Sequence, residues 1–356
     1  MALVRAGVLG ANITIVEQAV ALCEVGAGIQ LGPNAMRIFQ DWGLEKPLLD
    51  VGCEPESLVV RDARNDRVLT ARPFRHQDDA RQKYGAPHLC IRRADLQNVL
   101  LQAVVEAGVS LQLGCKFEKT DYSKYDVVLG CDGLHSKVRE QLLAGTRHGG
   151  KPRPTGHTAY RAMVDRALLP MELRKRLVQV WLGERQHVVL YPVDERTMNV
   201  VIAQKEAPTL DALQSPLLGS LLGAVIQNGG LTQWALFDRP PMLSPKHYAM
   251  EHWALLGDAA HPMRPYLAQG AAMAIEDAQV LGMAIARKST IHAALQHYAK
   301  ARWWRNSRVQ MRSQLQGFAF HASGFVRLAR DAVLRVAGER LTRMRWLYDY
   351  KATPSP

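Results

Sequence analysis

The spacing of apolar residues divides the chain into three stretches with different predicted structure. Residues 156–241 carry short alternating strands, HTAYRAMV, VQVWLG, HVVLYPV and MNVVIA, with one helical segment over 210–226. The chain is helical from about Ile291. We therefore expect an α/β unit, a mostly antiparallel sheet inserted into it, and a helical C-terminal part. Before the inserted sheet, the α/β unit is predicted to contain a helix end closed by Gly7, a strand over 13–16, a helix from Pro33 to Gly43, a hairpin around Asn65-Asp66 and a helix over 94–107. After the inserted sheet come the strand of WALLGDAAH and a small-residue helix over 271–286.

Length and composition fit a folded protein of two domains. The chain has 356 residues, of which 47% are hydrophobic and 22% are charged, which excludes a disordered chain. No run of about 18 apolar residues suits a membrane-spanning helix. The first residues, MALVRAGVLGANITIVEQA, lack the layout of a signal peptide, so a cytoplasmic protein is the expectation.

The cysteines do not predict a metal site or a disulfide framework. Cys23, Cys53, Cys90, Cys115 and Cys131 are scattered, with no C-x-x-C pair and no histidine at ligand spacing. We expect buried free thiols and no bound metal.

Positive charge is concentrated near the C-terminus. The net charge is +12, and the segment from Arg302 to Arg345 holds ten arginines against only Asp331 and Glu339. Arg302, Arg305, Arg308 and Arg312 recur at helical spacing. Two interpretations remain open: a basic stripe for phosphates or an anionic membrane surface, and a solvated helix face.

Two aspartates follow apolar strands and are candidates for binding a ligand. Asp132 stands in VVLGCDG and Asp258 in WALLGDAAH. Ligands of open α/β sheets lie at the carboxyl ends of the strands, where a carboxylate accepts hydrogen bonds from sugar hydroxyls. The alternative for each is an Asx turn or a helix N-cap.

Three further features of the sequence are candidates for ligand binding or catalysis. Glu17 ends the strand over 13–16, where an acid can bind a ribose, although no G-x-G-x-x-G precedes it. The helix that opens with AQGAAMAIEDA lets a planar ligand approach its N-terminus, or packs tightly on a sheet. His187 and Tyr191 lie on one face of HVVLYPV, where they either act on a phenol or are structural.

These segments resemble the single-component FAD-dependent aromatic hydroxylases, and most of all salicylate and hydroxybenzoate hydroxylases. The resemblance extends from Met1 to about Tyr350 and rests on EVGAGIQLGPNAMR, RRADLQNVL, LGCDGLHSKVR, HVVLYPV, WALFDRPP and ALLGDAAHPMRPYLAQGAAMAIEDA. It implies a glutathione-reductase-type FAD-binding domain (residues 1–155 and 242–318), a β-rich substrate domain (156–241) and a helical C-terminal segment (319–356).

The resemblance also implies roles for individual residues. Those expected at the cofactor are Glu17 on the adenosine ribose, Gly28 and Gln30 in the binding segment, Arg93 near the pyrophosphate, Asp132 and Gly133 in a motif linked to FAD and NAD(P)H, Asp258 on the ribityl chain, and Gly270 and Ala271 at the isoalloxazine carbonyl. His187 and Tyr191 are the expected catalytic residues, and Pro265 is expected to line the substrate pocket.

The implied activity is hydroxylation of a small aromatic acid by FAD, NADH or NADPH, and O₂ through a flavin hydroperoxide, without nucleic acid or integral membrane contact. The first strand and Gly-rich turn of the family are not present in the chain as given. We therefore expect weaker FAD binding than in a chain that has them, because the turn N–H groups and helix dipole bind the pyrophosphate. The alternatives are an impaired remnant of such an enzyme, a hydroxylase of another ring such as urate or a quinone precursor, and a basic protein that binds a membrane or a nucleic acid.

Overall fold

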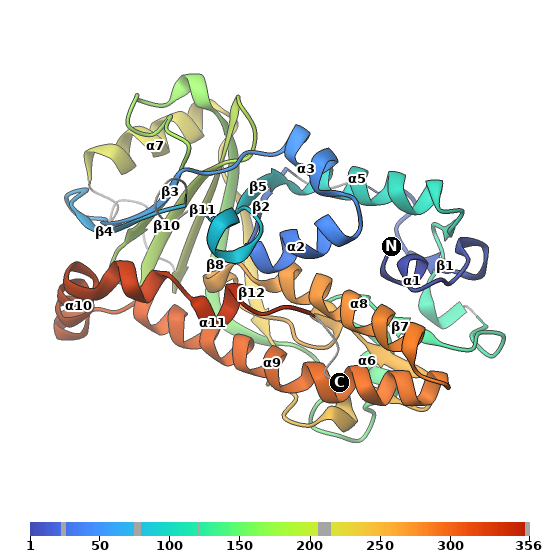
Figure 1. Cartoon of the computed structure of the whole chain (residues 1–356). Coiled ribbons are helices and arrows are strands. Elements are labelled where there is room, and N and C mark those ends of the chain that lie inside the picture. Colours follow the sequence, from blue (N-terminus) through green and yellow to red (C-terminus); the bar gives the residue numbers. More distant parts are fainter. Residues whose placement is uncertain (23–25, 75–79, 120, 206–214, 353–356) are drawn as a thin grey trace.

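The computed structural model describes residues 1–22, 26–74, 80–119, 121–205 and 215–352. Figure 1 shows a large sheet at one end of the molecule and an α/β part at the other, with two long helices, α8 (Gly270–Arg287) and α9 (Ile291–Phe320), running along one side. The expected α/β architecture with an additional mixed sheet and a helical C-terminal part is confirmed.

The α/β part contains short parallel strands. β1 (Thr14–Val16) pairs with β6 (Ser110–Gln112), and β7 (Val128–Gly130) pairs with β14 (Trp253–Leu255), both in parallel. β13 (Ala249–Met250) lies antiparallel to β14, and β2 (Gly28–Leu31) lies antiparallel to β5 (Leu89–Arg92). The helices of this part are α1 (Ala2–Arg5), α2 (Pro33–Asp41), α3 (Glu45–Val51), α4 (Ala80–Tyr84), α5 (Arg93–Glu106) and α6 (Lys137–Leu142).

Apolar side chains of α2, α5 and α8 form the core of this part. Met36, Phe39, Leu96 and Met273 belong to one buried cluster. Each helix contributes the apolar face that its sequence spacing predicts, so packing rather than propensity holds these helices in place.

The large sheet has the strand order β12-β8-β11-β10-β9-β3-β4. Val188 and Leu190 of β10 pack toward α7 (Pro216–Gln227) in one core, whereas Tyr191 and Val193 pack in a second core on the other face. Since side chains alternate along a strand, the two faces bury different residues of each strand. The strands are β3 (Ser57–Asp62), β4 (Val68–Pro73), β8 (Arg153–Asp165), β9 (Leu177–Leu182), β10 (Gln186–Pro192), β11 (Thr197–Lys205) and β12 (Thr232–Asp238).

The hairpin β3–β4 lies outside the range 156–241 that the sequence predicts for the substrate domain. The hairpin itself is where the pattern predicts it, with Asp66 in the turn at φ 59°. β3 pairs in parallel with β9, so the sheet also includes residues 57–73. The domain boundaries stay a prediction.

Arg302 and Arg305 of α9 fit neither expected interpretation, whereas Arg308 and Arg312 of the same spacing are exposed. Arg302 is fully buried and forms ion pairs with Glu276 and Asp277 of α8, at 2.8 Å each. Arg305 pairs with Glu276 at 2.6 Å and stacks on the Tyr350 ring, 3.7 Å from its centroid. These two cations stabilise the contact between helices and are neither a binding stripe nor a solvated face.

Candidate active site

Asp258 and the N-terminus of α8 lie next to each other. Asp258 stands in the short helical turn Gly257–Ala259 after β14. A β-carbon on Gly270, the first residue of α8, would lie 3.9 Å from Asp258 Oδ1. Desolvation raises the pKa of Asp258, although the charges of His261 and Arg93 oppose the shift. Asp258 nevertheless has exposed surface. A carboxylate that is closely surrounded but still accessible is well placed to bind a polar ligand.

Asp277 of α8 holds the Asp258 turn in place. Its Oδ2 accepts hydrogen bonds from the Gly257 N–H (3.1 Å) and lies 2.5 Å from His261 Nε2. Its Oδ1 accepts from Arg302 Nε and Asn306 Nδ2, both at 2.8 Å. Burial alone would raise the pKa of Asp277, but the charges of His261 and Arg302 outweigh it and hold the pKa below its ordinary value. The quoted motifs contain His261 and Asp277, but nothing in the sequence pattern indicates that these residues meet each other or Arg302.

Arg139 connects the two aspartate motifs. Its Nη1 donates to the carbonyl oxygens of Ala259 (2.9 Å) and Ala260 (2.8 Å), beside Asp258. Arg139 belongs to α6, whose N-terminus is bound by Asp132. The loop after β7 and the loop after β14 are therefore one hydrogen-bonded unit.

The carboxylate of Asp132 caps helix α6. It accepts from Ser136 Oγ at 2.5 Å, from the Lys137 N–H at 2.6 Å and from the Val138 N–H at 3.1 Å. The N-cap interpretation therefore describes its contacts, and its role at a cofactor stays a prediction. Beside it, Gly133 has φ +76° and open space where a side chain would be.

Arg93 links the Asp258 region to the large sheet. It begins α5, and its positive charge acts on the carboxyl of Asp258 and on the hydroxyl of Tyr191, in both cases lowering a pKa that burial raises. Glu17 lies at the carboxyl end of β1, where its Oε1 accepts from the Ala19 N–H at 2.8 Å.

Gly28 brings strand β2 against the large sheet. Its N–H donates to Asn199 Oδ1 at 2.7 Å. A β-carbon there would lie 2.7 Å from Val193 Cγ1 and 2.8 Å from Tyr191 Cε2. The close packing of β2 on Tyr191 thus requires a glycine at position 28. Gln30 of the same strand lies opposite Cys90 of β5.

His187 and Tyr191 share a buried face of β10, as the alternation predicts. The His187 Nδ1 lies 2.9 Å from His321 Nε2 at the end of α9, and its ring centroid lies 5.5 Å from that of Tyr266, which follows Pro265. Burial lowers the pKa of His187 and the neighbouring imidazoles of His321 and His157 lower it further, so this imidazole is neutral at neutral pH.

The surroundings of His187 contain polar atoms without a partner. The Tyr266 hydroxyl and His321 Nδ1 are buried and have no hydrogen-bond partner among the described residues. These two atoms are therefore free to form a hydrogen bond with a water molecule or a polar ligand. No feature of the sequence points to His321, because this residue lies about 130 positions from His187 in a segment with only a helical pattern.

The loop that contains Tyr266 also leads into α8. Pro265, whose side chain is exposed, opens a turn over Pro265–Leu267, and Ala268 then adopts a left-handed conformation with φ 49° before α8 begins. A strained residue of this kind is typical of functional loops. The Asp258 region and the His187 region are thus connected by one short loop.

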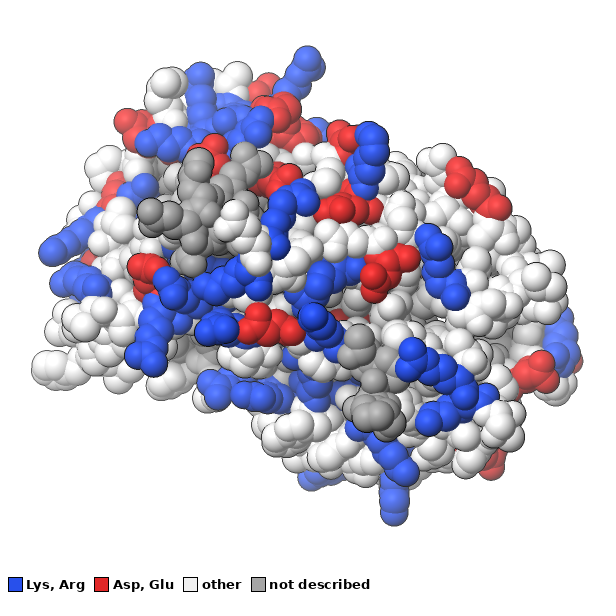
Figure 2. Space-filling model, in the orientation of Figure 1, with Lys and Arg blue, Asp and Glu red and all other residues white. Residues whose placement is uncertain are grey.

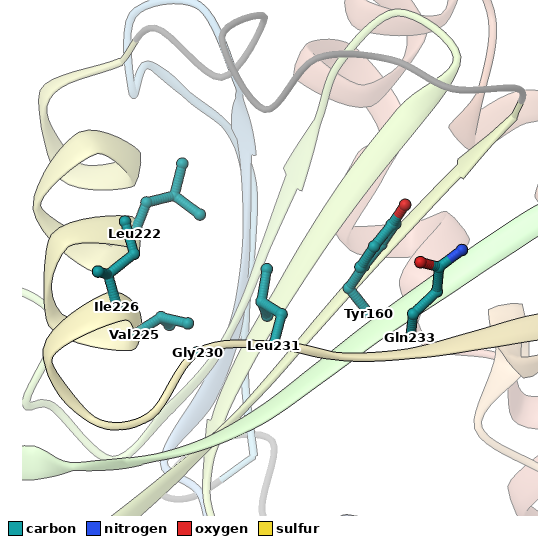
Figure 3. A pocket seen from close by; sticks show the side chains of 7 residues that line it. All are labelled: Tyr160, Leu222, Val225, Ile226, Gly230, Leu231 and Gln233. Atoms are coloured by element: carbon teal, nitrogen blue, oxygen red, sulfur yellow. The ribbon is translucent and has the colours of Figure 1, made fainter.

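A pocket lies outside the region of Asp258 and His187. It has a volume of about 310 Å³ and lies between α7 and the sheet (Figure 3), where it is lined by Tyr160, Leu222, Val225, Ile226, Gly230, Leu231 and Gln233. Tyr160 packs with the α7 core, so this pocket is on the opposite face of the sheet from His187. It is not part of the candidate site.

No metal cluster and no helix able to cross a membrane occur in the described ranges. No group of three or more His, Cys, Asp or Glu side chains there could hold a metal ion. In the same ranges, none of the helices has the length and hydropathy of a membrane span. Cys53 and Cys90 are buried, as expected, whereas Cys131 is exposed and Cys23 lies outside the described residues.

Comparison with known proteins gives consistent matches. A model of the FAD binding domain family matches residues 120–313. The chain is 32% identical over 383 residues to 3-amino-4-hydroxybenzoate 2-monooxygenase PtnB3 of Streptomyces platensis, covering 99% of this chain and 92% of that protein. It is 29% identical over 371 residues to 3-hydroxybenzoate 6-hydroxylase 1 of Aquipseudomonas alcaligenes, covering 95% and 92%.

Two solved structures share the fold. HpxO of Klebsiella pneumoniae, in complex with FAD and uric acid, superimposes with a TM-score of 0.80 at 19% identity, covering 94% of this chain and 96% of that chain. A substrate complex of salicylate hydroxylase gives 0.76 at 22% identity, covering 97% and 98%. The family match, the relatives and the fold agree with the site, in which an accessible carboxylate adjoins a helix N-terminus without a side-chain cap. The chain therefore belongs to the FAD-dependent aromatic hydroxylases, and it is a flavoprotein monooxygenase whose cofactor is FAD.

Proposed function

We propose that this protein hydroxylates a small aromatic acid, using NADH or NADPH and O₂ as co-substrates. The relatives named above act on hydroxybenzoates, which are aromatic carboxylates. The observation that carries the proposal is the Pro265–Leu267 turn, which connects the helix N-terminus beside Asp258 with the buried imidazole of His187. A cofactor ring at the helix and a substrate ring at His187 would then be neighbours.

The residues around Asp258 fit FAD. The Asp258 carboxylate would accept hydrogen bonds from ribityl hydroxyls, and the N–H groups of Gly270 and Ala271 would face the isoalloxazine carbonyl, since α8 has no side-chain cap. Arg93 would lie near the pyrophosphate and Glu17 near the adenosine ribose. Gly28 and Gln30 would contribute the β2 segment, and Asp132 and Gly133 would keep the neighbouring loop in place. Bound FAD supplies the electron transfer and oxygen activation that no side chain provides.

His187 and Tyr191 would act on the substrate ring. A neutral imidazole can accept a hydrogen bond from a phenol, which increases the electron density of the ring before it attacks oxygen. The His187–His321 hydrogen bond fixes the orientation of the imidazole. The hydroxyl of Tyr191, which burial keeps protonated by raising its pKa, would donate to a substrate oxygen, and Pro265 would form one wall.

The test is product formation by the FAD-loaded protein. The protein is incubated with NADH or NADPH, air and a set of aromatic acids that includes salicylate and 3-hydroxybenzoate, and products are identified by mass spectrometry. We expect a product with one added oxygen atom. His187→Ala should lower kcat at least tenfold and Tyr191→Phe should raise KM, whereas His292→Ala, at an exposed position in α9, should change neither.

Two results would contradict this proposal. Hydroxylation of urate but of no aromatic acid would mean a different substrate class. Bound FAD without oxygenation of any ring would mean an impaired remnant. If His187→Ala behaves as the parent protein, the role of the imidazole is wrong even when the substrate class is right.

A further inference from the structure

Helix α10 (Gly324–Thr342) has its apolar side chains on the outside. Phe325 and Val336 are both 90% exposed, and Leu328 and Val333 are 53% and 52% exposed. In contrast, the buried side chains of this helix include Arg327 and Asp331. A helix on the surface of a soluble protein normally has the reverse distribution.

Most of the exposed apolar residues of α10 form one stripe, which leaves out Val326 and Leu341. Positions 325, 328, 329, 332, 333 and 336 follow the i, i+3, i+4 spacing that places side chains on one face of a helix. Ala329 and Ala332, which are both exposed, lie between the larger side chains. We call the six residues at these positions the α10 stripe.

Polar contacts attach the opposite face of α10 to the protein. Arg327 Nε pairs with Glu184 Oε1 at 3.0 Å, and Arg330 Nη1 donates to the carbonyl oxygens of Ala319 (3.2 Å) and Phe320 (3.1 Å) at the end of α9. Gly338 lies against Thr70 of β4, where a β-carbon would come within 2.5 Å of the threonine side chain. Helix α10 lies at one end of the molecule (Figure 1), and the side chains of the α10 stripe are exposed there.

The charges beside the stripe are basic. Arg335 is exposed on one flank of the stripe and Arg340 is exposed beyond its C-terminal end, while Glu339 is paired with Arg343 at 2.7 Å. The chain has a net charge of +12, and Figure 2 shows more basic than acidic side chains over the face that it draws. An exposed apolar stripe bordered by arginines is the pattern of a helix that lies in the interface of an anionic bilayer.

We propose that the α10 stripe binds the protein to an anionic lipid surface. Phe325 and Val336 would enter the region below the headgroups, and Arg335 and Arg340 would contact the lipid phosphates. The attachment is peripheral, since no helix in the described part of the chain can cross a membrane. A second copy of the chain fits this face less well, because two like-charged molecules would bring their arginines together.

The test is co-sedimentation of the FAD-loaded protein with vesicles of phosphatidylcholine, with or without phosphatidylserine. We expect binding to the mixed vesicles, which weakens as salt is added because the attraction is screened. The double substitution Phe325→Ser and Val336→Ser should reduce the partition coefficient by at least about tenfold. Arg335→Gln with Arg340→Gln should remove most of the dependence on phosphatidylserine.

The control is Met171→Ser, which changes a side chain that is 74% exposed outside α10 and should leave binding unchanged. Circular dichroism and flavin content confirm that each variant is folded, so a loss of binding is not a loss of structure. Absence of binding to mixed vesicles at low salt would overturn the proposal. A dimer detected by light scattering, disrupted by the serine substitutions and unaffected by lipid, would show that a second copy covers the stripe instead.

Discussion

His261 Nε2 lies 2.5 Å from Asp277 Oδ2, and neither side chain has any exposed surface. The same carboxylate oxygen accepts the N–H of Gly257, the residue before Asp258. A residue on α8 thus fixes the turn that presents Asp258 to the N-terminus of that helix. The Asp258 turn and the packing of α8 on α9 are thus connected through Asp277, because Arg302 of α9 pairs with its other oxygen.

Asp258→Ala should abolish most flavin binding without unfolding the protein. The carboxylate is accessible and its hydrogen bonds to ribityl hydroxyls are charge-assisted, each worth about 1.5–3 kcal/mol. The flavin absorbance of the purified variant measures the effect. Asp50→Ala, at an exposed carboxylate of α3, is the matched control. Stoichiometric FAD in the Asp258 variant would contradict the assignment.

Asp277→Ala should destabilise the whole protein. Removing this buried carboxylate leaves His261 without its acceptor and Arg302 with Glu276 as its one remaining anion, and breaking a buried ion pair in this way costs about 3–5 kcal/mol. Urea unfolding should show this loss, and the same Asp50→Ala control should change the free energy of unfolding by less than about 0.5 kcal/mol. An equal effect of the two substitutions would mean that the network is not a source of stability.

The stability of the protein should fall as the pH drops below about 6.5. Burial lowers the pKa of His187, and it lowers that of His321 to about 3, so the unfolded chain binds protons at these residues before the folded protein does. The unfolding free energy then decreases with falling pH between the unfolded pKa and the folded pKa, by at most about 1.4 kcal/mol per pH unit for each histidine.

The substitution His321→Gln should make this pH dependence shallower. The slope should change by less than about 1.4 kcal/mol per pH unit, because His321 is only half-buried. His292→Gln, at an exposed histidine, should leave the slope unchanged. Urea midpoints measured between about pH 7.5 and 4.5 provide the comparison. A slope that His321→Gln does not alter would mean that the pKa of His321 is the same in the folded and the unfolded chain.

Gly28→Ala should weaken the contact between β2 and the large sheet. The added methyl group would lie within 2.8 Å of Tyr191 and Asn199 atoms, and overpacking of this kind costs about 1–3 kcal/mol. Gly223→Ala in α7 is the matched control, because nothing lies within 4 Å of its β-carbon and alanine favours a helix by about 0.5–1 kcal/mol. Thermal unfolding should therefore shift in opposite directions for the two variants.

Local chemistry made several elements predictable from the sequence. The hairpin follows from Asp66 between two alternating runs, and Asp66 adopts φ 59° as a hairpin turn requires. The helix that follows Pro33 and the amphipathic helix after Arg92 both form, since their signals lie within a few residues of the helix itself.

Contacts between distant segments were not predictable in the same way. The parallel pairing of β3 with β9 joins residues more than 100 positions apart. The helical spacing of Arg302 and Arg305 is the same whether they face solvent or Glu276, and only the position of α8 decides between the two. His321 likewise has no local signal, and its proximity to His187 depends on where α9 ends.

The most direct test of the central claim is a single-turnover experiment with ¹⁸O₂. The FAD-loaded protein, NADH or NADPH, and the aromatic acid that gives the fastest nicotinamide oxidation are mixed under ¹⁸O₂, and the product is analysed by mass spectrometry. We expect one ¹⁸O atom in a new ring hydroxyl, and a much lower yield of labelled product from the His187→Ala variant. Oxidation of the nicotinamide with all of the oxygen recovered as hydrogen peroxide, and no labelled ring product from any aromatic acid, would contradict it.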